Sequence, residues 1–271
     1  MKCAVLGDPI AHSLSPVLHR AGYAAAGLEG WSYGSARVGE DDLAGFLAGL
    51  DEGWRGLSLT MPLKRVALRL AARCTDRALL AGAANTLVLE GGVPVLADNS
   101  DLPGAVAAVR ERYDGPVTAA TVLGGGATAA STGLALCELG ARTVTLLVRA
   151  PERAAEAVEA IARHPAGVHV EVAALADGPV RGEVVVSTIP AVAQEPRLVA
   201  RCADAPVIFE VLYDPWPTPL ATASSGVLVT GLDLLAHQAA LQFELFTGVA
   251  APLEAMRGAG AEALARRQAS L

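Results

Sequence analysis

Residues 117–130, VTAATVLGGGATAA, indicate the class of fold more clearly than any other part of this chain. The apolar run over 117–123 predicts a β-strand, and the glycines at 124–126 predict a tight turn into a helix over 127–139. Gly124, Gly126 and Ala129 meet the G-x-G-x-x-G/A spacing, which lets backbone amides and a helix N-terminus approach a pyrophosphate. A dinucleotide-binding turn is the favoured interpretation, and an ordinary strand–helix connection is the alternative.

The chain continues to alternate between strand and helix after this turn. A helical pattern covers 151–163, and apolar runs predict strands over 142–148, 168–173, 183–187, 207–210 and 227–229. Such alternation is typical of a doubly wound parallel sheet, so the segment from Asp101 to Gly231 is expected to form a Rossmann-type domain. Helices over 232–246 and 253–269 follow it.

The first hundred residues predict a separate α/β layer, because strands and helices alternate there as well. Strands are expected over 2–6, 31–38 and 56–60, with a hairpin over 85–96 that turns at Gly91-Gly92. The expected helices are one from Pro16 with Ser15 as N-cap, one over 41–50 capped by Asp41, one beginning at Pro62 with Lys64 in its first turn, and one over 101–112. The chain therefore reads as two α/β domains with junctions near Asp101 and Gly231.

Composition excludes several classes of protein. Of 271 residues, 52% are hydrophobic and 18% charged, and the net charge of −7 comes without a basic block, so disorder and nucleic-acid binding are disfavoured. No run reaches the roughly 18 apolar residues of a membrane helix. The four cysteines, Cys3, Cys74, Cys137 and Cys202, show no metal-ligand spacing, and no signal peptide is recognisable. We therefore expect a cytoplasmic protein with reduced thiols and no metal site.

The end of the second strand of the Rossmann-type domain discriminates between NAD and NADP. An NAD-binding domain carries an acidic residue there, which holds the ribose 2′-hydroxyl. This chain instead places Arg149 and Arg153 after the strand, and guanidinium groups match phosphate geometry. The pattern favours NADP, although two solvated arginines at a helix start would look the same.

Three polar loops in the first hundred residues carry side chains that a folding core does not need. They contain Ser13 and Ser15, Thr60 and Lys64, and the stretch 98–101, Asp-Asn-Ser-Asp. A lysine held by a carboxylate would make a proton donor, for which Lys64 and Asp101 are the candidates. A surface lysine and a helix-capping aspartate are the structural alternatives, and Asp98 fits the carboxylate role equally well from the sequence alone.

These motifs together resemble the shikimate dehydrogenase family along the whole chain. The matching stretches are GDPIAHSLSP at 7–16, LTMPLK at 59–64, GAANTL at 82–87, DNSD at 98–101, STIP at 187–190, YDP at 213–215 and the segment 231–238. The resemblance implies NADPH-dependent reduction of 3-dehydroshikimate to shikimate, in the biosynthesis of aromatic amino acids. It also implies a substrate-binding domain over 1–100, a Rossmann-type domain over 101–231, and C-terminal helices over 232–271 that return to the substrate domain.

The resemblance also implies roles for individual residues. Lys64 and Asp101 would be the catalytic pair. The substrate would be bound by Ser13, Ser15, Thr60, Asn85, Tyr213 and Gln238, and Gln242, one helical turn beyond Gln238, could face it too. The cofactor would be bound by Gly124, Gly125, Gly126, Ala127, Arg149, Arg153, Thr188 and Gly231.

The cofactor half departs from the family pattern more than the substrate half does. Ala127 stands where a fourth residue of the glycine loop is more often glycine, and Val148 and Ala150 flank Arg149 where Asn and Thr are common. A quinate/shikimate dehydrogenase that uses NAD is therefore one alternative, and a weakly active paralogue that binds shikimate or NADP is another. Monomer and homodimer are both compatible with the sequence.

Overall fold

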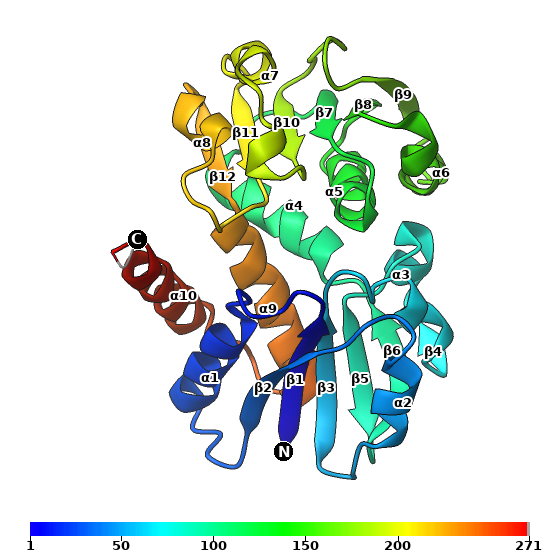
Figure 1. The fold of residues 1–271 in the computed structure, drawn as a ribbon, viewed down its shortest axis with the longest axis vertical. Helices are drawn as coiled ribbons and strands as arrows, with labels where there is room; N and C mark the ends of the chain where they lie inside the picture. The colour runs from blue at the N-terminus through cyan, green and yellow to red at the C-terminus, as the bar shows by residue number, and fades with distance from the viewer. Residues whose placement is uncertain (270–271) are drawn as a thin grey trace. The chain divides into compact units, whose positions relative to one another are not determined.

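The computed structural model describes residues 1–269 and divides the chain into two compact units (Figure 1). One unit comprises Met1–Ser100 together with Leu235–Leu271, and the other comprises Asp101–Leu234. Each unit contains one six-stranded sheet covered by helices, which confirms the predicted α/β class. No helix among residues 1–269 is both long enough and apolar enough to span a bilayer.

The sheet of the first unit is mixed, with strand order β2-β1-β3-β5-β6-β4. Strand β1 pairs in parallel with β2 and β3, while β5 is antiparallel to both β3 and β6. The strands are β1 (Lys2–Gly7), β2 (Ser32–Arg37), β3 (Trp54–Leu59), β4 (Arg73–Cys74), β5 (Thr86–Glu90) and β6 (Val93–Asp98). Gly91 and Gly92 both have positive φ, as a two-residue hairpin turn requires, so the predicted β5–β6 hairpin is confirmed.

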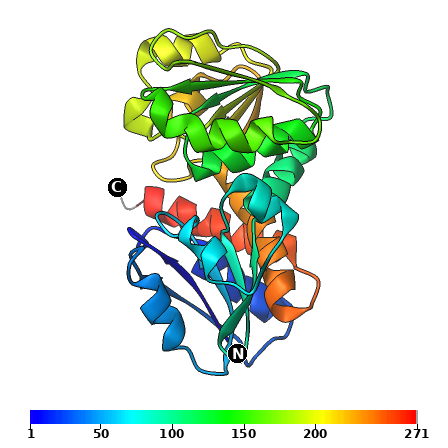
Figure 2. The ribbon, with the colours of Figure 1, turned by 90° about the vertical axis from the view of Figure 1, so that its right-hand side faces the viewer.

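Helices cover both faces of this sheet (Figure 1, Figure 2). Alternate residues of β3 divide between the faces: Leu57 and Leu59 join the core under α2 (Leu43–Ala48), η1 (Val66–Arg69) and α3 (Asp76–Ala81). On the other face lie α1 (Ser15–Ala25), α9 (Gly231–Thr247) and α10 (Leu253–Gln268). A Cβ at Gly56 would stand 2.0 Å from the Phe246 ring, so glycine is what lets α9 lie directly on β3.

The sheet of the second unit is parallel throughout, with strand order β12-β11-β10-β7-β8-β9. The strands are β7 (Ala119–Leu123), β8 (Thr143–Val148), β9 (His169–Ala174), β10 (Val184–Ser187), β11 (Val207–Glu210) and β12 (Val227–Thr230). The order reverses between β7 and β10, which is the switch point where doubly wound sheets bind ligands. This arrangement confirms the predicted Rossmann-type sheet.

Helices flank this sheet too. On one face, α7 (Pro196–Cys202) and α8 (Pro219–Ala223) pack on Leu123, Val185 and Ile208 of the strands. The remaining helices, α4 (Asp101–Arg112), α5 (Ala127–Glu138) and α6 (Ala155–Ala162), pack side by side, with η2 (Pro151–Ala154) before α6 and η3 (Ala191–Ala193) before α7. The core of this unit therefore has two apolar layers around the central strands β7, β8, β10 and β11, which are buried on both faces.

Two helix starts differ from the prediction. Helix α1 begins at Ser15 with Leu14 as its N-cap, so Ser15 is a first-turn residue and not the cap. The hydroxyl that accepts a first-turn hydrogen bond belongs to Ser13, whose Oγ lies 3.3 Å from the backbone N of Ser15. The N-cap of helix α2, which begins at Leu43, is Asp42 and not the predicted Asp41, and Asp42 makes no side-chain capping bond.

The helix predicted from Pro62 is wrong. Residues 61–65 form turns, and only the single 3₁₀ turn η1 follows. The carbonyl of Lys64 accepts a hydrogen bond of 2.7 Å from the backbone N of Ala84, a neighbouring segment, instead of serving the ladder of its own helix. Lys64 is consequently not in the first turn of a helix, and its charge does not oppose a helix dipole.

Candidate active site

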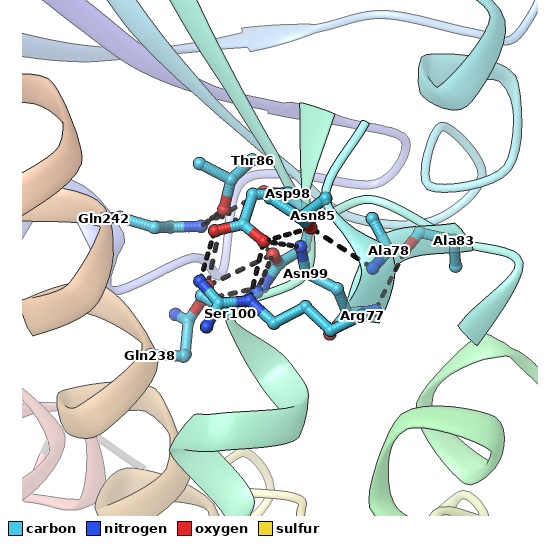
Figure 3. Close-up of polar contacts among 11 residues, drawn as sticks. Arg77, Ala78, Ala83, Asn85, Thr86, Asp98, Asn99, Ser100, Gln238 and Gln242 are labelled. Carbon is cyan, nitrogen blue, oxygen red and sulfur yellow. Dashed lines mark hydrogen bonds and ion pairs between the residues drawn. The ribbon is translucent and has the colours of Figure 1, made fainter. Parts of the chain in front are cut away.

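Asn85 is the centre of a buried polar cluster at the start of β5 (Figure 3). Its Oδ1 accepts hydrogen bonds from the backbone N of Ser100 at 2.8 Å, from Ser100 Oγ at 3.1 Å and from Thr86 Oγ1 at 2.9 Å. Its Nδ2 donates to Oε1 of Gln238 on α9 at 3.1 Å. The two predicted substrate-binding amides are thus brought into direct contact in the first unit.

Asp98, at the end of β6, is committed to a structural ion pair. Its carboxylate accepts from Arg77 through both Nε, at 2.7 Å, and Nη2 (Figure 3). It also accepts from Thr75 Oγ1 at 2.6 Å. Burial alone would raise the pKa of Asp98, but the hydrogen bonds from Arg77 and Thr75 and the Arg77 charge bring it below its ordinary value. The structure therefore distinguishes the roles of Asp98 and Asp101, which the sequence alone does not.

Asp101 is the first residue of α4, directly after Ser100, and is 6% exposed. Lys64 is half-buried in the turn after β3, where its backbone is tied to Ala84, the residue before Asn85. Asp101 belongs to the second unit and Lys64 to the first. Lys64 and Asp101 each take part in an interaction within the protein.

The serine loop and the loop after β3 lie at the same edge of the first sheet. Ser15 is buried and Ser13 half-buried in the loop that leads into α1. Thr60 donates its backbone N–H to the carbonyl of Leu6, and a Cβ at Gly7 would lie 2.3 Å from Thr60 Cγ2. The predicted residues Ser13, Ser15, Thr60 and Lys64 therefore all follow strands that end at one edge, as expected for a site at the carboxyl ends of parallel strands.

The glycine turn after β7 has the geometry that a phosphate-binding turn needs. Gly124 has φ of +116°, and a Cβ there would lie 2.3 Å from Thr188 Oγ1. Gly126 is the exposed N-cap of α5, and a Cβ there would meet nothing within 4 Å. Gly125 lies against Ala154, and Ala127 is the first residue of α5. The backbone amides at this helix start are thus open to an anion.

The two predicted phosphate-binding arginines are both exposed. Arg149 follows β8 and Arg153 lies in η2. Within residues 1–269, neither guanidinium forms an ion pair with a carboxylate of the protein. Two unpaired cations beside the end of β8 are compatible with a bound phosphate.

The remaining predicted residues lie after the last strands of the second sheet. Thr188 follows β10 and donates its hydroxyl to the carbonyl of Leu123 at 2.8 Å. Gly231 opens α9, and a Cβ there would stand 2.4 Å from the carbonyl of Val211. Tyr213 is half-buried two residues beyond Val211. Gly231 thus allows close approach of the loop that carries Tyr213.

Comparison with known proteins places this geometry in a family. Residues 5–87 match the model of the shikimate dehydrogenase substrate binding domain, and residues 231–259 match that of the shikimate 5′-dehydrogenase C-terminal domain. The chain is 32% identical over 270 residues to the shikimate dehydrogenase (NADP(+)) of Desulfitobacterium hafniense, covering 97% of this chain and 98% of that protein. The chain belongs to the shikimate dehydrogenase family.

Solved structures of the family agree with this assignment. The crystal structure of Mycobacterium tuberculosis shikimate dehydrogenase is similar with a TM-score of 0.87 and 43% identity, over 97% of this chain and 99% of that one. The Thermus thermophilus shikimate 5-dehydrogenase in complex with NADP(H) and shikimate is similar with a TM-score of 0.80 and 28% identity, over 97% and 99% of the two chains.

Some polar residues of this shikimate dehydrogenase family member were not singled out by sequence analysis. Arg77 and Tyr33 carry no motif, yet Arg77 binds the Asp98 carboxylate and Tyr33 donates a hydrogen bond to Ser58. Gln242 was expected to face the substrate. It is 1% exposed and bonds instead to Ser58, Thr86 and the backbone of Asn85. In the sequence, the only signal for Gln242 was its position one helical turn beyond Gln238.

Proposed function

We propose that this chain catalyses the reversible, NADPH-dependent reduction of 3-dehydroshikimate to shikimate in aromatic amino-acid biosynthesis. The observation that carries the proposal is the hydrogen bond between Asn85 and Gln238. Asn85 lies in the region that matches the family's substrate-binding domain, and Gln238 in the region that matches its C-terminal domain. A buried amide pair of this kind suits a substrate made of hydroxyl groups. A ligand without hydroxyls would leave buried polar groups of the site unpaired, at a cost of about 1–3 kcal/mol for each donor.

The proposed substrate contacts follow from the chemistry of each side chain. The hydroxyls of Ser13 and Ser15 and the phenol of Tyr213 would donate to the carboxylate. Thr60, Asn85 and Gln238 would bind the ring hydroxyls. The relative in complex with NADP(H) and shikimate supports this choice of ligand.

The proposed chemistry needs a proton donor beside the carbonyl at C3. Negative charge grows on the carbonyl oxygen as a hydride reaches the carbon, and the ammonium of Lys64 would stabilise that charge and supply the proton. Asp101 would orient the Lys64 side chain and hold a neighbouring substrate hydroxyl.

We propose NADP as the cofactor, which supplies the hydride when it is bound in reduced form. Gly124, Gly125, Gly126 and Ala127 would hold the pyrophosphate at the start of α5, and Arg149 and Arg153 would hold the 2′-phosphate. Thr188 and Gly231 would lie beside the nicotinamide. The open space at Gly126 and the exposed guanidiniums support this fit, and the relatives named for NADP(+) favour the same cofactor.

We also propose that the protein acts in the cytoplasm, as a monomer or a homodimer. None of the four cysteines is in a disulfide, and Cys3, Cys137 and Cys202 are buried as free thiols. Burial raises the pKa of Cys3 to about 11, so this thiol is protonated and poorly reactive at neutral pH. Unpaired thiols of this kind suit a reducing compartment.

The experiment that tests the function offers the purified protein shikimate or quinate, each with NADP⁺ or NAD⁺, and follows the absorbance of the reduced nicotinamide. The proposal predicts a strong preference for shikimate with NADP⁺. Comparable turnover of quinate or with NAD⁺ would favour a quinate/shikimate dehydrogenase. No turnover with any pair would favour a paralogue that binds shikimate or NADP without efficient catalysis.

A further inference from the structure

Glu210, the last residue of β11, carries a carboxyl group that the proposed chemistry does not use, although its side chain is completely buried. Its Oε2 accepts hydrogen bonds from Gln194 Nε2 at 2.6 Å and from Thr218 Oγ1 at 2.9 Å. Its Oε1 accepts from the backbone N of Leu212 at 3.1 Å. Burial raises the pKa of Glu210, and the hydrogen bonds that it accepts oppose that rise. The carboxyl group is thus held by neutral donors from two different loops.

The partners of Glu210 fix the direction of these hydrogen bonds. The backbone N–H of Leu220 can only donate, and it meets Gln194 Oε1 at 3.0 Å, so Nε2 of that amide is the group that faces Glu210. The Thr218 hydroxyl is the N-cap of α8 and accepts from the backbone N of Ala221 at 3.2 Å, which leaves its hydrogen for Glu210. Both carboxylate oxygens therefore act as acceptors, and an amide in the same place could accept at only one atom.

One carboxylate joins the two ends of a single loop. Residues 211–218 connect β11 to α8, and Glu210 binds Leu212 near the start of this segment and Thr218 at its end. The same carboxylate is also bound from the loop that follows β10, the strand next to β11 (Figure 1). Tyr213 is the residue after Leu212. The segment that carries Tyr213 is thus tied at both ends to one buried group.

Two further contacts fix the backbone that leads to Tyr213. The backbone N of Val211 donates to the carbonyl of Ser187, at the end of β10, at 3.1 Å. A Cβ at Gly231 would stand 2.7 Å from the carbonyl carbon of Leu212, so the first residue of α9 lies directly against this backbone. The position of Tyr213 within the second unit is therefore determined by β10, β11 and the start of α9.

We propose that Glu210 is a positioning residue that holds Tyr213 at the substrate carboxylate by fixing the loop 211–218. The inference rests on the proposed function, in which Tyr213 donates to that carboxylate. Because Glu210 is completely buried, it acts through the backbone of Leu212 and not by contact with a ligand. A carboxylate suits this task, because hydrogen bonds to a charged group are stronger than those between neutral groups.

Glu210→Gln tests the inference, because it keeps the size of the side chain but replaces one acceptor oxygen with a donor. The KM for shikimate should rise about tenfold, because the loop loses its hold on Tyr213. The value of kcat and the KM for NADP⁺ should stay within about twofold of the unmodified protein, because Lys64 and the glycine turn lie outside the network. Glu195→Gln is the matched control: it makes the same change at an exposed residue that forms no capping hydrogen bond, and should leave all three constants unchanged.

A second substitution shows whether Glu210 acts through Tyr213. Tyr213→Phe removes the hydroxyl that the proposal places at the substrate carboxylate. In the Tyr213→Phe background, Glu210→Gln should raise the KM for shikimate by at most about threefold, against about tenfold on its own. A merely structural role would give the same factor in both backgrounds.

Gln194→Met is a milder variant. It removes one hydrogen bond to Glu210 and leaves those from Leu212 and Thr218 in place. We expect the KM for shikimate to rise about threefold, and the rise to disappear in the Tyr213→Phe background. This variant decides the question if Glu210→Gln does not fold.

The outcomes separate this inference from the proposed function. An unmodified protein that does not oxidise shikimate would overturn the proposed function and the inference with it. The inference alone would be overturned if the unmodified protein oxidises shikimate while the folded variant, Glu210→Gln or Gln194→Met, has an unchanged KM or shows the same rise in the Tyr213→Phe background.

Discussion

Nδ2 of Asn85 donates to Oε1 of Gln238 at 3.1 Å, joining the start of β5 to helix α9 across 153 residues of sequence. The first unit is therefore completed by a segment from the other end of the chain, after the whole second unit has intervened. Phe246 on the same helix lies over Gly56 of β3, so packing and hydrogen bonding both fix α9 on the sheet. The candidate substrate site depends on this return of the chain.

Replacement of Lys64 should separate catalysis from binding. Lys64→Ala removes the proposed proton donor, so we expect kcat to fall by at least about 100-fold while the Kd for shikimate changes little. Arg65→Ala, a change of the neighbouring cation, is the control and should keep kcat near that of the unmodified protein. Unchanged turnover in Lys64→Ala would remove the lysine from the mechanism.

Replacement of Arg149 should affect one cofactor and spare the other. Arg149→Ala removes a guanidinium from the proposed 2′-phosphate site, and we expect the KM for NADPH to rise about tenfold, with the KM for NADH little changed. Arg163→Ala, which removes another exposed arginine of the second unit, serves as the control. Equal effects of Arg149→Ala on both cofactors would show that it does not bind the 2′-phosphate.

The buried pair of Asp98 and Arg77 should contribute strongly to stability. Asp98→Asn leaves Arg77 without its carboxylate, and we expect the free energy of unfolding in urea to fall by about 2–4 kcal/mol. Because the pKa of Asp98 is lowered in the folded state, its contribution is present above the ordinary aspartate pKa and is lost only as pH falls below that range. Arg37→Ala breaks the exposed pair with Asp8 and should leave stability nearly unchanged.

His19 should make the first unit sensitive to acid. Its ring is fully buried and stacks on Tyr33 with centroids 4.1 Å apart, and burial lowers its pKa from 6.5 to about 3. The unfolded chain therefore takes up a proton below pH 6.5 that the folded chain refuses, so stability falls as pH drops from 6.5 toward 3.

His19→Phe keeps a ring against Tyr33 and removes this titration. The loss of unfolding free energy between pH 7 and pH 5 should shrink by about 2 kcal/mol relative to the unmodified protein, at about 1.4 kcal/mol per pH unit below the unfolded pKa. Urea unfolding at the two pH values measures it. Equal losses in both proteins would mean that His19 titrates normally in the folded state.

The strongest sequence signals correspond to elements with a local physical cause. The glycines at 91, 92, 124 and 125 sit where the backbone needs positive φ or close approach, and both turns form where predicted. The missed elements are short: α3, α7 and α8 have between five and seven residues, too few for a helical period to show. The helix predicted from Pro62 does not form, because the Lys64 carbonyl accepts a hydrogen bond from the backbone N of Ala84, which lies in another segment.

The candidate site was less predictable than the fold for the same reason. Family motifs named the residues that would touch the substrate, and their roles there are still predictions. The residues that hold them belong to no motif: Tyr33, Ser58 and Gln242 come from two strands and a helix that only the folded chain brings together. The sequence pattern gave Asp98 and Asp101 the same candidate role. The structure distinguishes them, because Arg77 forms an ion pair with Asp98.

The transfer of label from cofactor to product tests the central claim most directly. The protein would be incubated with 3-dehydroshikimate and NADPH carrying deuterium in both positions at C4, and the product examined by mass spectrometry. We predict shikimate with a single deuterium bound to C3, since the hydride comes from the nicotinamide and the hydroxyl proton from the protein. The absence of shikimate, or shikimate without deuterium at C3, would contradict the account.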